Sequence, residues 1–375
     1  MASVRRTAIA AVAALAPLGL AYRFALAYRV RAGYPRRNPP MITPADVGLS
    51  YRAMLITSDD VSLPAWFIPA RGGARGPGVV LIHGWESARD RTLPMALFLH
   101  AAGFHILTFD VRGHGTNPPD PLPLSAGEFG ADSLAAFHAL VEQPEVTIGA
   151  IAGHSMGAIG AILAAAADPS VAAVVATSGP ADPYRLTRQT FRLARLPIPN
   201  VIAYPLAWLT THVYLRPRRH TVAGTSAAAA IARYRGPVLL AHGTDDEVVP
   251  VGHMARLAAA ARTGRAGVPG PAVVETLLIA GGRHSWLYED EGYRRAVAGF
   301  LARALGGPFD PTMAADLAAA IPAERIPAGE AAFAAVDGEK SGLRTLAEIA
   351  LPGATRSRMS DREREGIPIA PAGEP

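Results

Sequence analysis

The chain contains 375 residues, of which 50% are hydrophobic and 18% are charged. This composition is sufficient to bury a large core, so it excludes a chain that is disordered throughout. The sequence has no cysteine, which excludes disulfide bonds, thiolate metal sites and a cysteine nucleophile.

The net charge of +5 comes from the N-terminal segment. Residues 1–45 contain seven arginines and no acidic residue, whereas the remainder carries 29 basic and 31 acidic residues. A nucleic-acid-binding protein would carry its excess positive charge on a folded face. Because the remainder of this chain is nearly neutral, the sequence argues against nucleic acid as a partner.

The N-terminal segment also contains an uncharged apolar run, residues 7–22. A helix of that length reaches about 24 Å, short of the roughly 30 Å hydrocarbon core of a bilayer. Extension to residue 28 spans that core but includes Arg23. We therefore predict a single membrane anchor with a basic flank within residues 1–40. The arginines that follow the run favour a downstream domain on the cytoplasmic side.

Two alternatives remain open for this segment. One is a signal peptide that is cleaved at Ala25-Leu26-Ala27, so that the rest of the chain is exported. The other is a soluble or surface-lying helix.

From residue 51 the chain alternates between strand-like and helical segments. Several later strand-like runs are continuous and rich in β-branched residues, which is typical of strands that are covered on both faces. The alternation predicts an α/β fold with a mostly parallel eight-stranded sheet and helices on both faces. The expected strands are 51–57, 65–68, 79–82, 105–109, 147–152, 171–177, 238–241 and 273–279, and the expected helices are 93–102, 126–141, 156–167, 252–262 and 292–305.

Two segments interrupt this alternation. Residues 181–233 are too long for a simple connection and contain interspersed aromatic and basic residues, so we predict a helical cap insertion over one end of the sheet. Residues 306–375 form a tail rich in proline and alanine, which we expect to be mostly a mobile linker with short alanine-rich helices. The central domain is therefore expected at residues 41–305.

The motif with the clearest chemical meaning is Gly-x-Ser-x-Gly, which contains Gly153, His154, Ser155 and Gly157. It lies between a predicted strand that ends at residue 152 and a predicted helix that starts after the serine. Such a sharp turn strains the serine backbone, and flanking glycines avoid clashes there. The turn therefore predicts an exposed, nucleophilic serine at a helix N-terminus. The alternative is a glycine-rich turn without activity.

A nucleophilic serine needs an imidazole that takes its proton and an acid that orients the imidazole. His284 follows the last predicted strand on a glycine-containing loop, so it should lie at the carboxyl edge of the sheet, where Ser155 also emerges. His253 also follows the candidate acids, but its position at a helix start indicates the surface. We therefore predict Ser155 as the nucleophile and His284 as the base.

The acid is expected on a third loop at the same edge. Asp245 and Asp246 directly follow the predicted strand 238–241, and one of them can orient the histidine while the other positions the loop. Asp182, which follows the predicted strand 171–177, is a further candidate. Position alone leaves these three aspartates open.

The order of serine, aspartate and histidine along the chain is that of α/β-hydrolases. From residue 53 to about residue 305 the sequence resembles the serine α/β-hydrolase superfamily, in particular its esterase- and lipase-like, membrane-anchored bacterial members. Residues 81–85 (Leu-Ile-His-Gly-Trp) resemble the oxyanion loop of that superfamily. Residues 109–115 resemble its Asp-x-Arg-Gly-x-Gly turn, in which we expect Asp110 and Arg112 to form a structural ion pair.

The resemblance also implies the acid and the oxyanion hole. The superfamily's Gly-x-x-Asp-x-x-Val-Pro pattern falls on residues 243–250, which favours Asp246 over Asp245. By the same resemblance, the backbone N–H groups of Met156 and Trp85 form the oxyanion hole. Loss of one such donor typically costs about 2.7–4 kcal/mol of transition-state stabilisation.

These residues predict a serine hydrolase that cleaves carboxylic esters, including lipid-derived esters and thioesters, through an acyl-enzyme. The expected partner is a small-molecule acyl substrate, and the reaction requires no cofactor and no metal. A second hypothesis is a peptidase or amidase of the acyl-peptide or dipeptidyl-peptidase type, which usually carries a large extra domain. A third is a catalytically inactive, membrane-tethered binding scaffold, against which the intact serine, aspartate and histidine argue.

Overall fold

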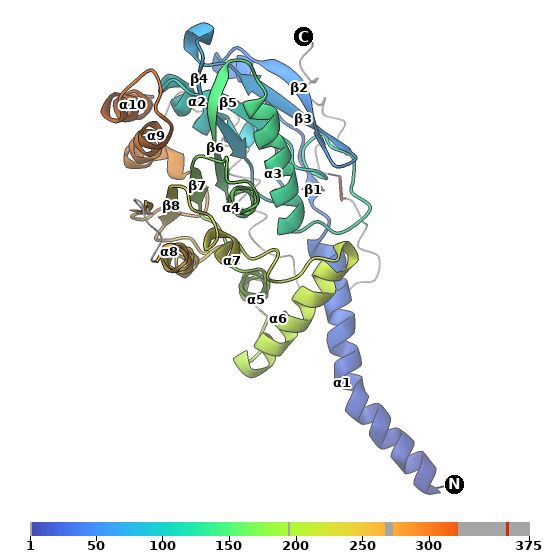
Figure 1. Cartoon of the computed structure of the whole chain (residues 1–375). Coiled ribbons are helices and arrows are strands. Elements are labelled where there is room, and N and C mark those ends of the chain that lie inside the picture. The colour runs from blue at the N-terminus through green and yellow to red at the C-terminus, as the bar shows by residue number, and fades with distance from the viewer. Residues whose placement is uncertain (1, 194–195, 267–272, 322–357, 360–375) are drawn as a thin grey trace.

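An eight-stranded sheet lies at the centre of the computed structural model, which describes residues 2–193, 196–266, 273–321 and 358–359 (Figure 1). Its strands follow the order β2-β3-β5-β4-β6-β7-β8-β9. They are β2 (Arg52–Ser58), β3 (Val61–Ile68), β4 (Gly76–Ile82), β5 (His105–Phe109), β6 (Val146–His154), β7 (Val174–Thr177), β8 (Val238–Gly243) and β9 (Val274–Ile279).

Within this sheet, only β3 runs against the other strands. It pairs antiparallel with both β2 and β5, whereas all remaining pairs are parallel. The interior strands β4, β5, β7 and β8 are buried along almost their whole length, as expected for strands that are covered on both faces. The predicted mostly parallel, eight-stranded sheet is therefore confirmed.

Helices cover both faces of the sheet and form a hydrophobic core on each (Figure 1). One face carries α3 (Ala126–Val141), α4 (Met156–Ala167), α7 (Ala227–Ile231) and α8 (Gly252–Arg265). The other face carries α2 (Leu93–Ala101), α9 (Glu291–Leu305) and α10 (Pro311–Ala319). Short 3-10 helices lie at Pro44–Val47, Arg71–Gly73, Arg89–Thr92, Arg216–Arg218 and Leu287–Glu289.

Two further helices, α5 (Pro183–Leu193) and α6 (Asn200–Leu215), lie in the segment between β7 and β8, and we call them the cap. The segment that directly follows α6 is connected to the body through Glu128 of α3. Glu128 accepts a hydrogen bond from the Ser125 backbone N–H at 2.7 Å, which caps α3, and it also lies 2.6 Å from His220 Nε2 and 3.4 Å from Arg218 Nε. A buried carboxylate that serves both segments fixes the cap relative to the sheet.

The N-terminal segment forms one helix, α1 (Ala2–Ala32). Its C-terminal half packs on the cap, where Tyr28 is buried and its hydroxyl lies 2.9 Å from Thr190 Oγ1. Its N-terminal half extends away from the body (Figure 1). Among the residues that the structure describes, no helix combines the length and the apolar character needed to cross a membrane. This finding does not support the predicted single membrane-crossing anchor in residues 1–40.

The C-terminal tail predicted at 306–375 begins with an ordered helix. The side chain of Asp310 caps α10 by accepting hydrogen bonds from the Thr312 and Met313 backbone N–H groups at 2.9 and 3.1 Å, and α10 packs against α9 and α2. The linker predicted for the rest of the tail lies almost entirely outside the described residues. A short parallel pair of β1 (Arg36–Arg37) and β10 (Arg358–Met359) is also described.

The expected ion pair between Asp110 and Arg112 is wrong. Asp110 is fully buried and instead pairs with Arg89, whose backbone N–H also donates to it at 2.7 Å. Arg112 points to the other side of the turn and pairs with Asp132 of α3 at 2.6 Å. The two side chains diverge because each finds a buried partner from a different segment of the chain.

Candidate active site

Ser155 occupies the turn between β6 and α4, and its backbone has φ +56° and ψ −117°. This conformation is strained for a residue with a side chain. A side chain at Gly153 would collide with the carbonyl of Gly157, and one at Gly157 would collide with the carbonyls of Ile82 and His83. The two glycines therefore let the turn pass close to the end of β4, as the motif predicts.

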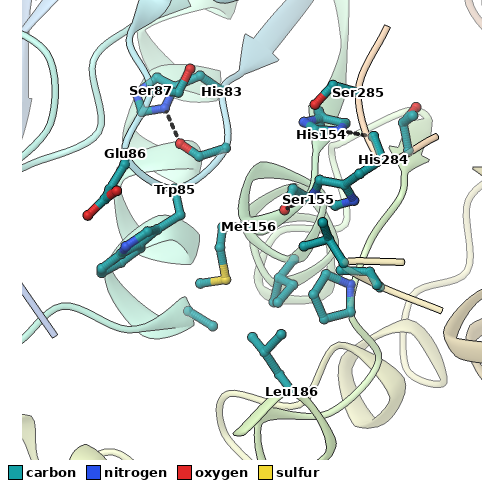
Figure 2. Close-up of a pocket in the computed structure, with 18 of the residues that line it drawn as sticks. His83, Trp85, Glu86, Ser87, His154, Ser155, Met156, Leu186, His284 and Ser285 are labelled. Carbon is teal, nitrogen blue, oxygen red and sulfur yellow. Dashed lines mark hydrogen bonds between the residues drawn. The ribbon is translucent and has the colours of Figure 1, made fainter. Parts of the chain in front are cut away.

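The side chains of Ser155, His284 and Asp246 lie in one hydrogen-bonded series. His284 Nε2 lies 3.0 Å from Ser155 Oγ, and His284 Nδ1 donates to Asp246 Oδ2 at 2.8 Å. Figure 2 shows Ser155 and His284 facing each other beside the first turn of α4. The serine follows β6, the aspartate follows β8 and the histidine follows β9, so three parallel strands in one half of the sheet bring them to the same edge.

Asp246 is buried and heavily hydrogen-bonded. Its Oδ1 accepts the backbone N–H groups of Val248 and Val249 at 3.0 and 2.8 Å. Burial acts to raise the pKa of Asp246, but hydrogen bonds with His242 and His284 outweigh it and hold the pKa well below its ordinary value. Asp246 therefore remains a carboxylate over the whole neutral range and can fix the orientation of the His284 ring.

The two alternative acids lie elsewhere. Asp245 is exposed and accepts a hydrogen bond from Thr244 Oγ1 at 2.9 Å. Asp182 accepts a hydrogen bond from Ser226 Oγ at 2.8 Å and lies 3.4 Å from Arg185 Nε. Neither aspartate is therefore the partner of His284 in these contacts, whereas Asp246 contacts the His284 ring.

Two histidines at the site make contacts that the sequence analysis did not predict. His154, directly before the serine, donates from Nε2 to the main-chain carbonyl of His284 at 2.7 Å. His242, at the end of β8, is buried, with Nε2 2.7 Å from the Val249 carbonyl and 3.2 Å from Asp246 Oδ2. Each lies at the carboxyl end of a buried strand, and this position in the sequence could have identified both histidines as neighbours of the site.

The surface position expected for His253 is wrong. His253 is only 8% exposed, and its Nδ1 accepts a hydrogen bond from the Ala181 backbone N–H at 2.9 Å. It therefore fixes the start of the connection that leads into the cap. The start of a helix is buried when another segment of the chain packs over it. The sequence around His253 does not show which segment packs there.

The segment 83–85 lies directly beside the serine. A Cβ atom added to Gly84 would lie 3.4 Å from Ser155 Cβ. His83 holds this segment, because its Nδ1 donates to the Gly84 carbonyl at 2.7 Å and its Nε2 accepts from the Val111 backbone N–H at 3.0 Å. Trp85 and Met156, the two residues expected to supply oxyanion donors, lie on the same side of Ser155 in Figure 2, with Met156 between Trp85 and Ser155.

A cavity of about 870 Å³ opens next to Ser155. Cavities that hold small-molecule ligands have volumes of about 300–1,000 Å³, so this one has room for a single small substrate. Side chains from the sheet edge, from the cap and from α1 contribute to its walls. The cap and α1 contribute Leu186, Thr187, Thr190, Thr211, Tyr214, Leu215, Tyr28, Arg31 and Ala32.

Comparison with known proteins gives matches in both sequence and structure. A model of the alpha/beta hydrolase family matches residues 79–298, which is more than half of the chain. An uncharacterized protein of Mycobacterium tuberculosis is 32% identical over 208 residues, which are 55% of this chain and 65% of that protein. The match thus spans less than two thirds of that relative's own length.

Solved structures with similar folds include an esterase and a peptidase. The esterase Pf2001 of Pyrococcus furiosus is 22% identical, with a TM-score of 0.57 over 73% of this chain and 97% of its own. The acylaminoacyl peptidase of Pyrococcus horikoshii is 17% identical, with a TM-score of 0.53 over 71% of this chain and 44% of its own. At these identities the similarity concerns the fold alone.

Proposed function

Because this chain belongs to the alpha/beta hydrolase family, we propose that it is a serine hydrolase that cleaves carboxylic esters through an acyl-enzyme on Ser155. The observation that carries this proposal is the hydrogen-bonded series from Ser155 through His284 to Asp246. This series adjoins a cavity large enough for a small acyl substrate.

In the first half-reaction, Ser155 Oγ attacks the ester carbonyl carbon while His284 Nε2 takes the hydroxyl proton. Asp246 holds the Nδ1–H side of the ring and stabilises the imidazolium that forms. The backbone N–H groups of Met156 and Trp85 donate to the oxyanion, each worth about 2.7–4 kcal/mol in the transition state. His284 then gives its proton to the departing alcohol, which leaves the acyl group on Ser155.

In the second half-reaction, a water molecule loses its proton to His284 Nε2 and attacks the acyl carbon. The tetrahedral intermediate collapses, Ser155 Oγ takes the proton back from His284, and the carboxylic acid leaves. The enzyme returns to its starting state, and no cofactor takes part.

The lining of the cavity supports an apolar acyl chain as the group that is bound. Trp85, Met156 and Ile159 line it from the body, and Leu186 and Leu215 line it from the cap. Burial of apolar surface contributes about 25 cal/mol per Å², so each added methylene that reaches these side chains should strengthen binding. Esters of apolar acids are therefore the proposed substrates.

A fluorophosphonate probe tests the nucleophile directly. The wild-type protein should be labelled covalently, and Ser155→Ala should not, with circular dichroism to show that both are folded. Rates on p-nitrophenyl acetate and p-nitroacetanilide then compare ester with amide cleavage, and the ester should react faster. A folded wild-type protein without labelling or ester cleavage would support the inactive scaffold, and a faster anilide would support the amidase.

A further inference from the structure

A group of exposed apolar side chains lies on two helices that border the candidate active site. α1 and α6 pack against each other near Ala32 and Leu215 and then diverge on the same side of the body (Figure 1). The part of each helix that points away from the body carries large apolar side chains between 40% and 79% exposed, and we call this set the α1–α6 apolar face. Its members are Leu15, Leu18, Leu20, Tyr22, Val201, Ile202, Tyr204 and Trp208.

Large apolar side chains are normally covered where several gather on one segment, as they do on residues 15–22 of α1 and 201–208 of α6. Contiguous exposed apolar surface beyond a few hundred Å² generally marks a protein–protein or membrane interaction site. Residues 15–20 of α1 are exposed all around the helix, and a helix that is apolar on every side is normally buried in protein or lipid. We therefore expect the α1–α6 apolar face to be covered by another molecule.

The charges around this face have one sign. Residues 1–45 and 183–244, which contain α1 and the cap, include no aspartate or glutamate. Arg23 of α1 and Arg192 of α5 are exposed and make no ion pair with any residue that the structure describes. A second copy of the chain would therefore bring arginine against arginine, and such like-charge contacts are unfavourable. An anionic surface instead attracts both segments.

The residue types fit a lipid surface in particular. Apolar side chains that enter the acyl region, aromatic residues at the polar boundary and nearby arginines are the features of helices that lie in a membrane interface. Tyr22, Tyr204 and Trp208 supply the aromatic residues, and Leu18 and Val201 supply aliphatic ones.

We propose that the α1–α6 apolar face docks peripherally on an anionic lipid surface. The same two helices also line the cavity beside Ser155, through Tyr28 of α1 and Tyr214 of α6. The inference depends on the exposed side chains and on the charge of these segments, and it does not depend on the reaction proposed above.

Co-flotation of the full-length protein with vesicles tests the proposal. The protein should float with vesicles of phosphatidylcholine and phosphatidylglycerol, and much less with phosphatidylcholine alone. Added salt should weaken flotation, because it screens exposed charges. Burial of a large apolar side chain favours partition and a charged glutamate opposes it, so Leu18→Glu and Trp208→Glu should each weaken partition by about tenfold or more.

Leu55→Glu is the matched control, because Leu55 is 68% exposed on β2, outside the α1–α6 apolar face. All three variants should keep the wild-type rate on soluble p-nitrophenyl acetate or, if the protein is inactive, the wild-type circular dichroism spectrum. Equal binding to neutral vesicles, or wild-type partition of either face variant, would overturn the proposal. Self-association without vesicle binding would likewise overturn it and would assign the face to a second copy.

Discussion

His154 Nε2 donates a hydrogen bond to the main-chain carbonyl oxygen of His284 at 2.7 Å, and the centres of the two rings lie 4.9 Å apart. The residue before the proposed nucleophile therefore holds the loop that carries the proposed base. Since the turn at Ser155 and the loop at His284 come from different strands, this bond connects the two parts of the site at the point where they must meet.

Replacement of His154 by phenylalanine keeps a ring of similar size but removes the donor. A typical hydrogen bond contributes about 0.5–1.5 kcal/mol, so kcat should fall by about two- to twelvefold as the His284 ring loses its support. KM should change little, because His154 acts through His284 and not on the substrate. His154→Gln restores a donor and should recover much of the rate. Equal rates for wild type and His154→Phe would contradict this positioning role.

The adjacent aspartates Asp245 and Asp246 differ in burial and in contact with His284, and their amide variants should differ accordingly. Loss of the acid in a Ser-His-Asp triad lowers kcat by about 10⁴, so Asp246→Asn should be nearly inactive. Asp245→Asn should stay within a few-fold of wild type, because Asp245 is exposed and contacts Thr244. Steady-state hydrolysis of p-nitrophenyl acetate measures both variants. A larger loss for Asp245→Asn would assign the acid to that residue.

Tyr28 of α1 lines the cavity and packs edge-on against Phe191 of the cap, with ring centres 5.9 Å apart. Tyr28→Ala removes this part of the cavity wall, so KM for p-nitrophenyl octanoate should rise by about tenfold. A tenfold rise corresponds to a loss of about 1.4 kcal/mol of apolar contact. The rate on the acetate ester should not change, since a two-carbon acyl group stays near Ser155. Tyr28→Phe keeps the ring and serves as the control. An equal rise in KM for the acetate and octanoate esters would contradict a role of Tyr28 in binding the acyl chain.

The positions of strands and of the three candidate residues could be predicted because they depend on local patterns. Continuous β-branched runs locate buried strands, and residues that follow parallel strands gather at one sheet edge. Ser155 and His284 were predicted in this way, and Asp246 was predicted as one of three possible aspartates. Asp246 could be chosen over Asp245 only through a family pattern, because adjacent residues on a loop point in directions that sequence position does not report.

The remaining contacts depend on pairings between segments that lie far apart in the sequence. Asp110 pairs with Arg89 and not with the nearby Arg112, because the turn that carries both aims them at different segments. The packing of Tyr28 on the cap likewise cannot be predicted from the apolar residues of the N-terminal segment. A pattern of hydrophobic residues reports that a helix has an apolar side, but not whether protein or lipid covers it.

The buried pair of Arg112 and Asp132 should stabilise the fold far more than the exposed contact of Arg112 with Asp59. Asp132 is fully buried and also accepts a hydrogen bond from Ser58 Oγ at 2.7 Å, whereas the Asp59 side chain is 70% exposed. Removal of one member of a buried pair costs about 3–5 kcal/mol, so Asp132→Ala should lower the free energy of unfolding by that amount. Asp59→Ala should cost about 0–1 kcal/mol. Urea denaturation at neutral pH compares the two, and similar losses would contradict the assignment.

Acid should destabilise the protein through three buried histidines. Burial lowers the pKa of His83 and of His253 to about 4, and that of His114 to about 3, from an ordinary value of 6.5. Between pH 6.5 and about 4 the unfolded chain therefore binds protons at these rings that the folded chain does not bind. Asp90 acts in the opposite direction, because burial raises its pKa from 3.8 to about 7.

Since three histidines oppose one aspartate, the free energy of unfolding should fall as the pH is lowered from 7 to 4, by on the order of a few kcal/mol. Urea denaturation at several pH values in this range measures the slope. His253→Asn supplies a side-chain oxygen for the Ala181 backbone N–H but does not titrate, so its stability should depend less steeply on pH than that of the wild type. Stability that stays constant or rises toward pH 4 would show that these histidines do not remain neutral in the folded protein.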